Sequence, residues 1–595
     1  MSEASASPPD PRPPVLSDPA ESTAGSRLLL FALPLLSLLL SLSGSAALPL
    51  IDRDEPRFAE ATREMGERGE WSVPFFNGDY RLDKPPLIYW LMGVCFRIFG
   101  ENEIGARMPS ILLTALLCLL LFLMGRSLFG LRAGVVAALS GATSLQFLIH
   151  GRLAVADMPM VVSIVAAQWA ILRLLEGGTA AWTCILWVDL ALGFLAKGPV
   201  AWAVPLVGLL LWRFLLWRSP APWRRLHAFR GSAVAVGIIA LWGIPALLST
   251  HGAFWTEGMG EHVLRRGVEA FDGRPHFWGY YLVSSLLSLF PWSAFLGWIL
   301  VSLQKNYSSR SAFLLSWLFS PFLLFTPYAT QLPHYLLPGF PAFFLLLGQA
   351  AATVRPRRMS LVIFWSLWGV GFLAGSFTLA ATLTRPWEGH YAALRTALWA
   401  LGGVLLSLCL LALVAKATLF SASAASPWAR PSPLFLPIGL GLSLLALAGS
   451  FHLLGTSLRS VEPALTLRGL WKDLPGDTIF VSSGYTEPSL VFYSHHRWIM
   501  TSKEQSPGSL SGTSAPFFFV RLERERTLRD ALQWLFLSGR TPIEVSPPLS
   551  LSSVQSNDVG IKAARIDGFD SARFSWVDLE VRVRPRPMEI PEKPQ

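Results

Sequence analysis

The stretch DRDEPRFAEATREMGERGEWSVPFFNGDYRLDKPPLIYW, from Asp52 to Trp90, decides the fold because it directly follows the first long apolar run of the chain. A simple loop between two membrane helices needs only a few polar residues and a turn, whereas this stretch is crowded with acidic and basic side chains. Charge beside an apolar segment is costly unless it is partnered. The stretch is therefore either a solvated surface or a functional site.

Composition places the rest of the chain in a membrane. Of the 595 residues, 52% are hydrophobic and 15% are charged, whereas a soluble protein carries about a quarter charged residues. The first apolar run, 28–50, is longer than a signal-peptide core and is predicted to be a retained anchor. We expect a polytopic α-helical membrane protein with about 13 transmembrane helices. The predicted spans are at about 28–50, 108–126, 133–150, 157–175, 181–196, 200–217, 231–249, 277–303, 311–328, 335–352, 359–382, 394–416 and 433–455.

The distribution of Lys and Arg orients these spans. Alternate loops are basic, most clearly RFLLWRSPAPWRRLHAFR (213–230), and the positive-inside rule places them in the cytoplasm. The opening stretch, RLAVADMP, the AKGP turn, GEHVLRR and TQLPHYLLP then all fall on the outer side. The net charge of +10 is spread among short loops, which fits membrane topology better than nucleic-acid binding.

Three regions follow from composition. Residues 1–26 are rich in Pro, Ser and Ala and are predicted to be a disordered cytoplasmic tail. Residues 27–456 form the transmembrane domain, with 51–107 as its first outer loop. Residues 457–595 are predicted to be a small α/β domain outside the membrane, without a catalytic motif. Its strands are expected at TIFVSS, APFFFVRL and FSWVDLEVRV and its helices at EPSLVFYSH and TLRDALQWLFLSG. The four cysteines form no CxxC or disulfide framework.

The first outer loop contains two predicted helices. Asp54 stands at an N-cap position, and Phe58 and Met65 share one helical face, which predicts an amphipathic helix at the membrane interface. A second, more apolar helix begins at Pro85 or Pro86. Composition alone leaves two interpretations of the flanking charges, because most charge runs are solvated salt-bridge surfaces. The short connection between the two helices lets both charged ends reach one cavity, which favours a site.

The motifs DEPRFAE, GEWSVPFFNG, RLDKPPLIYWL and FGENEIGARMPS together resemble the first periplasmic loop of lipid-linked-sugar glycosyltransferases with the C-type (GT-C) fold. This superfamily includes the aminoarabinose transferases of lipid A and the protein O-mannosyltransferases. The resemblance is dense over about 52–110 and continues loosely to about 340. It implies an integral-membrane inverting glycosyltransferase that moves a sugar from polyprenyl (undecaprenyl) phosphate to an envelope acceptor such as lipid A, a glycan or a protein. It also implies a monomer in the bacterial inner membrane whose active site faces the periplasm.

The resemblance assigns roles to two carboxylates and two cations. Asp54 is expected to be the catalytic base or orienting carboxylate, and Asp157 in RLAVADMP the second catalytic acid. A helix N-cap is the alternative for Asp157. Arg57 and Lys84 are expected to bind the donor phosphate, whose charge grows as it leaves.

Two more positions are expected to contact the phosphate. Lys197 in FLAKGP matches a lysine of the family, although a snorkelling interfacial lysine is the alternative. Tyr335 in TQLPHYLLP matches the tyrosine that contacts the phosphate, with an aromatic-belt anchor as the alternative. Gln331 stands where relatives commonly carry Lys, so that lysine's role is not transferred.

A divalent metal (Zn, Mg or Mn) is also possible. Asp83 stands where relatives often have a metal-ligating Glu, and His262 matches a histidine ligand. These two residues give an incomplete shell that phosphate or water would complete. Glu261 and His276 are expected to line the cavity.

A transporter or flippase of lipid-linked glycans is the alternative function, and a non-catalytic scaffold is a third. Transporters show internal repeats and charges at mid-membrane depth. We find no convincing repeat, and the ionisable clusters lie at the outer ends of the spans. The sequence leaves both the sugar and the acceptor open.

Overall fold

A computed structural model describes most of the chain. The described residues are 23–217, 222–265, 269, 276–355, 357–383, 390–421, 435–471, 474–501, 516–527, 555–556, 562–570 and 575–584. Most of the tail predicted at 1–26 lies outside these residues. The helix predicted from TLRDALQWLFLSG also lies outside them, apart from Thr527, which ends a strand.

The described residues contain eight helices that are long and apolar enough to cross a membrane, or nine if one pair bent by 105° counts as a span. The eight are α1 (Thr23–Leu42), α4 (Glu103–Phe129), α7 (Asp157–Leu175), α8 (Ala180–Lys197), α10 (Ala228–Ser249), α17 (Arg358–Leu383), α18 (His390–Ser421) and α19 (Phe435–Arg459). The bent pair joins α13 (Tyr280–Ser288) to the segment that ends with α14 (Leu296–Lys305). Apolar helices of 10–17 residues are α3 (Leu87–Phe99), α5 (Leu131–Thr143), α9 (Val200–Leu211, continued by Trp212–Leu216), α15 (Ser309–Phe325) and α16 (Phe340–Thr353).

Each predicted span coincides with one of these helices or with a consecutive pair, such as α5 and the short α6 (Leu145–His150). The first span was predicted too long, because α1 ends at Leu42 rather than near residue 50. Gly44 has a φ of +77°, a left-handed conformation that glycine adopts without a steric penalty. The chain therefore leaves the helix before the apolar run ends.

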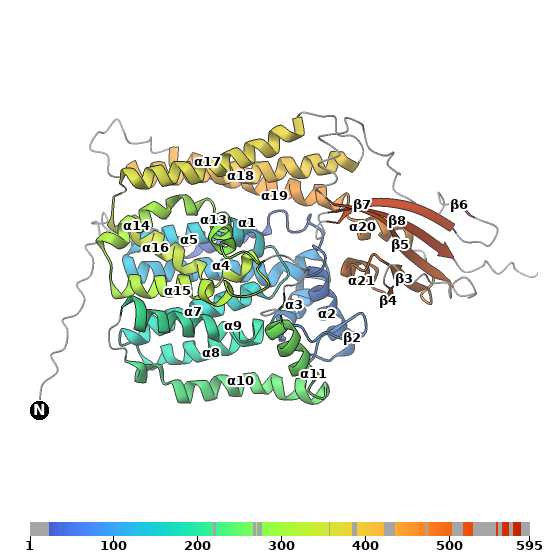
Figure 1. Ribbon diagram of the computed structural model, residues 1–595, viewed down its shortest axis with the longest axis horizontal. Helices are drawn as coiled ribbons and strands as arrows, with labels where there is room; N and C mark the ends of the chain where they lie inside the picture. The colour runs from blue at the N-terminus through green and yellow to red at the C-terminus, as the bar shows by residue number, and fades with distance from the viewer. Residues whose placement is uncertain are drawn as a thin grey trace, which may run out of the picture.

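The long helices run side by side, and the polar elements gather at one end of them (Figure 1). At that end lie α2 (Glu55–Arg68), α3, α11 (Ala253–Trp255) and the C-terminal sheet. The main helical core is formed by α4, α5, α7, α15 and α16 together with α14. Of the segments predicted to share one side of the membrane, the first outer loop, the residues that follow α10 and the C-terminal part therefore lie at one end of the bundle.

The C-terminal part contains a mixed six-stranded sheet with the order β4-β3-β5-β8-β7-β6. β3 pairs in parallel with β4 and β5, and the remaining pairs are antiparallel. The strands are β3 (Ile479–Ser483), β4 (Trp498–Thr501), β5 (Phe517–Thr527), β6 (Gln555–Ser556), β7 (Lys562–Asp570) and β8 (Ser575–Arg584), accompanied by α20 (Pro463–Trp471) and α21 (Pro488–Ser494). The three predicted strands and the helix at EPSLVFYSH are all present.

The first outer loop folds as α2, a small hairpin of β1 (Phe75–Phe76) and β2 (Asp79–Tyr80), and α3. Phe58, Ala61 and Met65 are buried, as the amphipathic pattern predicts. Glu60 and Glu64 are buried as well, which corrects the expectation of a polar face turned to solvent at an interface. The reason is that α2 packs against α3, β1 and α21, while Glu60 pairs with Arg63 and Glu64 accepts from Arg68 and from the N–H of Gly78.

One hydrophobic core joins the first loop to the C-terminal sheet. It contains Phe58 and Met65 of α2 and Tyr89 of α3 together with Leu490 of α21 and Phe518 of β5. Neither region buries its apolar face alone, because each supplies the other's cover. The sheet therefore helps to fix the position of α2, whose first turn carries the charged residues of the opening motif.

Candidate functional site

The start of α2 holds Asp54 at the N-cap, as predicted, but the Asp54 side chain makes no capping hydrogen bond. Its backbone carbonyl instead accepts from Phe58 N at 3.2 Å. Arg57 follows three residues later, and residues three apart lie on the same side of a helix. The exposed Asp54 carboxylate and the half-buried Arg57 guanidinium both line one large cavity.

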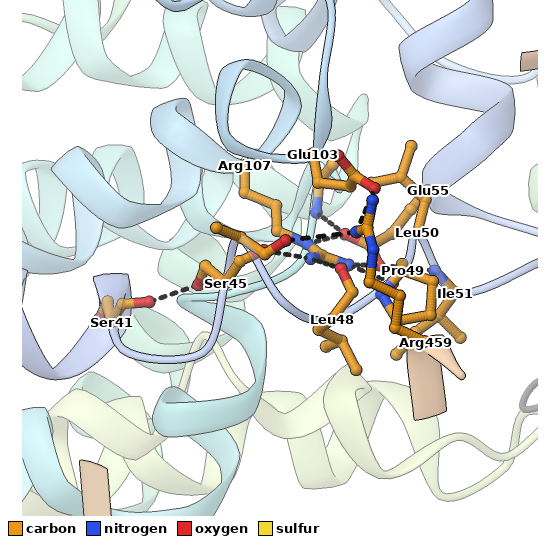
Figure 2. A network of polar contacts seen from close by, with 12 residues as sticks. Ser41, Ser45, Leu48, Pro49, Leu50, Ile51, Glu55, Glu103, Arg107 and Arg459 are labelled. Atoms are coloured by element: carbon orange, nitrogen blue, oxygen red, sulfur yellow. Dashed lines mark hydrogen bonds and ion pairs between the residues drawn. The ribbon is translucent and has the colours of Figure 1, made fainter. Parts of the chain in front are cut away.

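A buried ion pair that is not part of the cavity lining holds this turn in place (Figure 2). Arg107 of α4 binds Glu55 in a bidentate arrangement, with Nε–Oε1 at 2.8 Å and Nη2–Oε2 at 2.6 Å. Arg107 also donates to the carbonyls of Ser45, Leu48 and Pro49. Glu55 in turn accepts from the N–H of Ile51 and Ala154. The Glu55 carboxylate and the Arg107 guanidinium are thus satisfied in a fully buried site, which ties Glu55, the residue after Asp54, to α4 and to Ile51.

The cavity has a volume of about 1660 Å³ and unlike walls. One wall carries charge from the first loop, the start of α7, the end of α8 and the segment before α16. The apolar part of the lining comes largely from α10, through Val236, Ile239, Trp242 and Leu247. Asp54, Asp157, Arg57, Asp83, Lys84, Lys197 and Tyr335 all line this cavity.

The cationic part of the cavity centres on the turn before α3. Asp83 lies between two cations, with Lys84 Nζ at 2.6 Å from Oδ1 and Arg81 Nη2 at 3.2 Å from Oδ2. Arg81 also donates to Tyr89 Oη at 3.1 Å. Burial, and after it the like charge of Arg81, lowers the pKa of Arg57 from its ordinary value. Arg57, Arg81 and Lys84 thus share this part of the cavity with the carboxylates of Asp54 and Asp83.

Asp157 and Lys197 form a second ion pair in the lining of the cavity, with Nζ and Oδ1 2.6 Å apart. Asp157 is the first residue of α7 rather than its N-cap, and Lys197 is the last residue of α8. Asp157 is therefore not the N-cap residue of α7, and Lys197 is ion-paired; the roles expected for the two residues stay predictions. His334 lies nearby and interacts electrostatically with this pair, and burial lowers the pKa of His334 to about 3. His334 is therefore neutral at physiological pH.

Tyr335 lines the cavity beside His334 and packs on Phe325 with ring centroids 5.0 Å apart. Gln331 lines it as well. His276, predicted to line the cavity, does not: its Nε2 donates to the carbonyl of Thr326 at 2.8 Å, next to Gln331. Glu261 and His262 fall within a π-helix, Thr256–Arg265, but their side chains lie outside what the structure describes.

Some residues of the cavity were not predicted as site residues. Arg81 belongs to the quoted loop, but its role became visible only through its position between Asp83 and Tyr89. Glu487 and Thr486 come from the C-terminal part, which lacked a recognisable motif. The hairpin that places Arg81 had a usable signal: Asn77 and Gly78 have φ values of +57° and +91°, and Asn-Gly is a strong short-range hairpin sequence.

The contacts of Asp83 do not fit a metal ion, because each of its carboxylate oxygens already faces a cation. A bound cation there would have to displace Lys84 or Arg81. The metal predicted at Asp83 and His262 therefore stays a prediction.

Comparison with known proteins gives matches in sequence and in structure. The family model described as dolichyl-phosphate-mannose-protein mannosyltransferase matches residues 83–244. The undecaprenyl phosphate-alpha-4-amino-4-deoxy-L-arabinose arabinosyl transferase of Edwardsiella ictaluri is 32% identical over 354 residues, which are 57% of this chain and 62% of that protein. The corresponding transferase 2 of Pseudomonas fluorescens is 32% identical over 319 residues, 50% of this chain and 55% of that protein. The chain thus matches less than two thirds of the length of these relatives.

Structural similarity extends over nearly the whole molecule. The structure of ArnT from Cupriavidus metallidurans bound to undecaprenyl phosphate superposes with a TM-score of 0.70 at 18% identity, covering 96% of this chain and 100% of that one. The chain has the ArnT fold. The apo form of the same protein gives a TM-score of 0.67. The ArnT-like architecture therefore includes the C-terminal sheet as well as the helices, although the sequence similarity covers only about half of the chain.

Proposed function

We propose that this ArnT-like chain is an integral-membrane glycosyltransferase that moves a sugar from polyprenyl (undecaprenyl) phosphate to an envelope acceptor. One observation carries the proposal. Carboxylates from two distant segments, Asp54 and Asp157, line the same cavity as Arg57, Lys84 and Lys197, and that cavity also has an apolar wall. The names of the sequence relatives and the ligand of the similar structure point to the same donor.

The charged and the apolar parts of the cavity lining suit a donor with a charged head group and an apolar tail. The prenyl chain would lie along the apolar face of α10, where it buries hydrocarbon. Its phosphate would meet Arg57, Arg81 and Lys84, which supply charge-assisted hydrogen bonds. As the bond from the anomeric carbon to the phosphate oxygen breaks, negative charge grows on the phosphate, and preorganised cations stabilise it most at that moment.

The two carboxylates are held differently and suit different tasks. Asp157 is ion-paired with Lys197 and therefore positions a cation. Asp54 faces the cavity from the N-cap, so it can take a proton from an acceptor hydroxyl or orient an acceptor phosphate. Attack from the side opposite the leaving phosphate inverts the anomeric carbon.

The membrane arrangement is part of the proposal. We place thirteen spans, with the cavity and the C-terminal α/β domain on the periplasmic side of a bacterial inner membrane, and a monomer as the working unit. The gathering of α2, α3, α11 and the sheet at one end of the helices supports a single outer face (Figure 1). The first loop resembles that of the aminoarabinose transferases of lipid A. We therefore favour lipid A as the acceptor over a glycan or a protein.

The test supplies purified protein with labelled undecaprenyl-phosphate sugar and follows transfer to lipid A or hydrolysis of the donor. The exchange Asp54→Asn should lower turnover about 100-fold or more while donor binding persists. Lys84→Ala should raise the donor concentration needed for half-maximal rate, because it removes a phosphate ligand. Glu70→Gln, at an exposed position of the same loop, is the matched control.

Two results would oppose the proposal. If the wild-type protein neither transferred nor hydrolysed the sugar but moved the lipid across vesicle membranes, it would be a transporter. If Asp54→Asn retained full turnover, the catalytic carboxylate would be assigned wrongly even if the enzyme class were right.

A further inference from the structure

A second cluster of carboxylates lies beside the cavity, at the junction between the first loop and the C-terminal part. Asp52, Glu487 and Asp570 are all buried, and one carboxylate oxygen of each lies within 4.8 Å of the others. They come from the segment after α1, the residue before α21 and the end of β7. Segments that are more than 400 residues apart in sequence thus bring three acids to one point.

A fourth buried carboxylate lies near this cluster. Glu462 precedes α20, is 1% exposed and interacts electrostatically with Asp52 and Asp570. Its Oε1 has no hydrogen-bond partner among the described residues, while the backbone N–H of Ala464 approaches the same carboxyl group. A buried carboxylate oxygen without a partner loses its hydration without compensation. The cluster therefore calls for a positive ligand.

The donors that hold the Asp52 side chain are uncharged. Asp52 accepts hydrogen bonds from Ser489 N at 2.8 Å and Ser489 Oγ at 2.7 Å, both uncharged donors. Arg57 interacts with Glu487, but it also faces Asp54 and Asp83 in the main cavity.

We propose that Asp52, Glu462, Glu487 and Asp570 bind one calcium ion that ties the C-terminal domain to the first loop. Calcium takes six to eight oxygen ligands at about 2.3–2.6 Å in flexible geometry, and two oxygens on opposite sides of such an ion are about 4.8 Å apart. The described donors are all oxygens, whereas zinc favours nitrogen and sulfur in a tetrahedral shell.

The cavity gives the ion a route in and water ligands to complete its shell. Asp52 and Glu487 line the cavity, whereas Glu462 and Asp570 do not. The ion would thus enter from the cavity side and be closed off by the sheet. Asp52 is two residues from Asp54, so the ion would also stiffen the turn that carries the proposed catalytic carboxylate. This site is separate from the metal predicted at Asp83 and His262.

The experiment measures calcium bound to the full-length protein in detergent, after EDTA treatment and dialysis against calcium, and the thermal unfolding temperature with calcium or EDTA. About one calcium should bind per chain, and calcium should raise the unfolding temperature by several degrees. Glu462→Gln should weaken calcium binding about 10-fold or more and remove most of the shift. Asp570→Asn should do the same and serves if the first variant does not fold.

The sign of the effect in EDTA separates a metal site from an ordinary structural role. Without calcium, Glu462→Gln should be at least as stable as the wild type, because it removes one charge from a buried acidic cluster. A merely structural glutamate would instead leave the variant less stable under both conditions. Two control variants should keep the rise in unfolding temperature with calcium. They are Glu523→Gln, at an exposed position of β5, and Asp83→Asn, in the other predicted metal site.

The proposal is overturned if the wild type binds no more calcium than Glu462→Gln, or if calcium leaves its unfolding temperature unchanged. Preferential binding of zinc or magnesium would overturn the assignment to calcium. None of these readouts requires glycosyl transfer, so failure here and failure of the proposed function are distinguishable.

Discussion

At the residue scale, the most constrained group near the site is Arg107. Its guanidinium is fully buried and satisfies Glu55 and three backbone carbonyls at once. Such a fork cannot be replaced by a point charge, because lysine offers neither the planar geometry nor enough donors. Arg107 lies in the quoted motif FGENEIGARMPS, so the motif is explained by a structural need as well as by chemistry.

We therefore expect Arg107→Lys to destabilise the protein by about 3 kcal/mol, because one partner of a buried pair is left incompletely satisfied. The loss is measured as a fall in thermal unfolding temperature of the protein in detergent. Arg97→Lys, at an exposed position of α3, is the control and should leave the temperature unchanged. Equal stability of the two variants would show that the buried contacts of Arg107 with Glu55 and the three carbonyls do not stabilise the protein.

His334 gives a prediction about pH. Because its folded pKa of about 3 lies below the ordinary value of 6.5, the unfolded state binds the proton first as pH falls. The native state therefore loses stability from about pH 6.5 down towards pH 3, and by pH 5 the loss from this group is about 1–2 kcal/mol. His334→Gln should show a smaller fall in unfolding temperature between pH 7 and pH 5 than the wild type. His227→Gln, at an exposed position, should keep the wild-type slope.

Residue types and spacing were enough to predict several members of the site, and the reason is local. Asp54 and Arg57 occupy one helical turn, and Asp83 and Lys84 are neighbours, so short motifs fix their relation. The pairing of Asp157 with Lys197 joins residues 40 positions apart, and Glu487 reaches the cavity from the far end of the chain. Such partners follow from tertiary packing, which the local pattern does not contain.

At the scale of elements, apolar length predicted the position of the spans because each helix must satisfy its backbone polar groups within itself. The polar elements were harder to predict. The amphipathic pattern of α2 suggested one face on lipid or protein and one in water, but Glu60 and Glu64 are buried as well, and α21 supplies part of the apolar cover through Leu490. A covering element that lies more than 400 residues away in the sequence leaves no trace in the pattern of α2 itself.

The hairpin of β1 and β2 makes a specific contact with the C-terminal sheet. Asn77 Nδ2 donates to the carbonyl of Trp498 at 2.8 Å, and Trp498 N donates to Asn77 Oδ1 at 2.9 Å. The amide side chain thus pairs with β4 much as a neighbouring strand would. Both bonds depend on one side chain, which makes the contact testable.

Asn77→Ala should therefore loosen the hairpin from β4, at a cost of about 1–2 kcal/mol for two hydrogen bonds. Hydrogen exchange at residues 75–80 and 498–501 should accelerate about 10-fold. Tyr80→Phe, which keeps the ring contact with Phe75, is the matched control. Unchanged exchange in Asn77→Ala would show that the shared apolar core alone holds the two segments together.

At the scale of the whole molecule, the C-terminal domain is part of the site's foundation. It shares one hydrophobic core with α2 and α3, it supplies Glu487 and Thr486 to the cavity, and Tyr493 Oη accepts from Leu50 N at 2.9 Å. The division at residue 457 thus separates two regions in sequence that are continuous in packing.

A chain that ends after Ser460 is accordingly expected to lose glycosyl transfer by about 100-fold or more, even though every proposed catalytic residue remains. Phe58 and Met65 would face water instead of Leu490 and the sheet, and burying each such side chain contributes about 1.5–3 kcal/mol. The loop at 51–107 should become sensitive to limited proteolysis, while the helical bundle still inserts in the membrane. A control chain that lacks only residues 585–595 should keep its activity. Full transfer by the shorter chain would mean that the first loop holds its shape unaided, and that the shared hydrophobic core has no part in positioning Asp54.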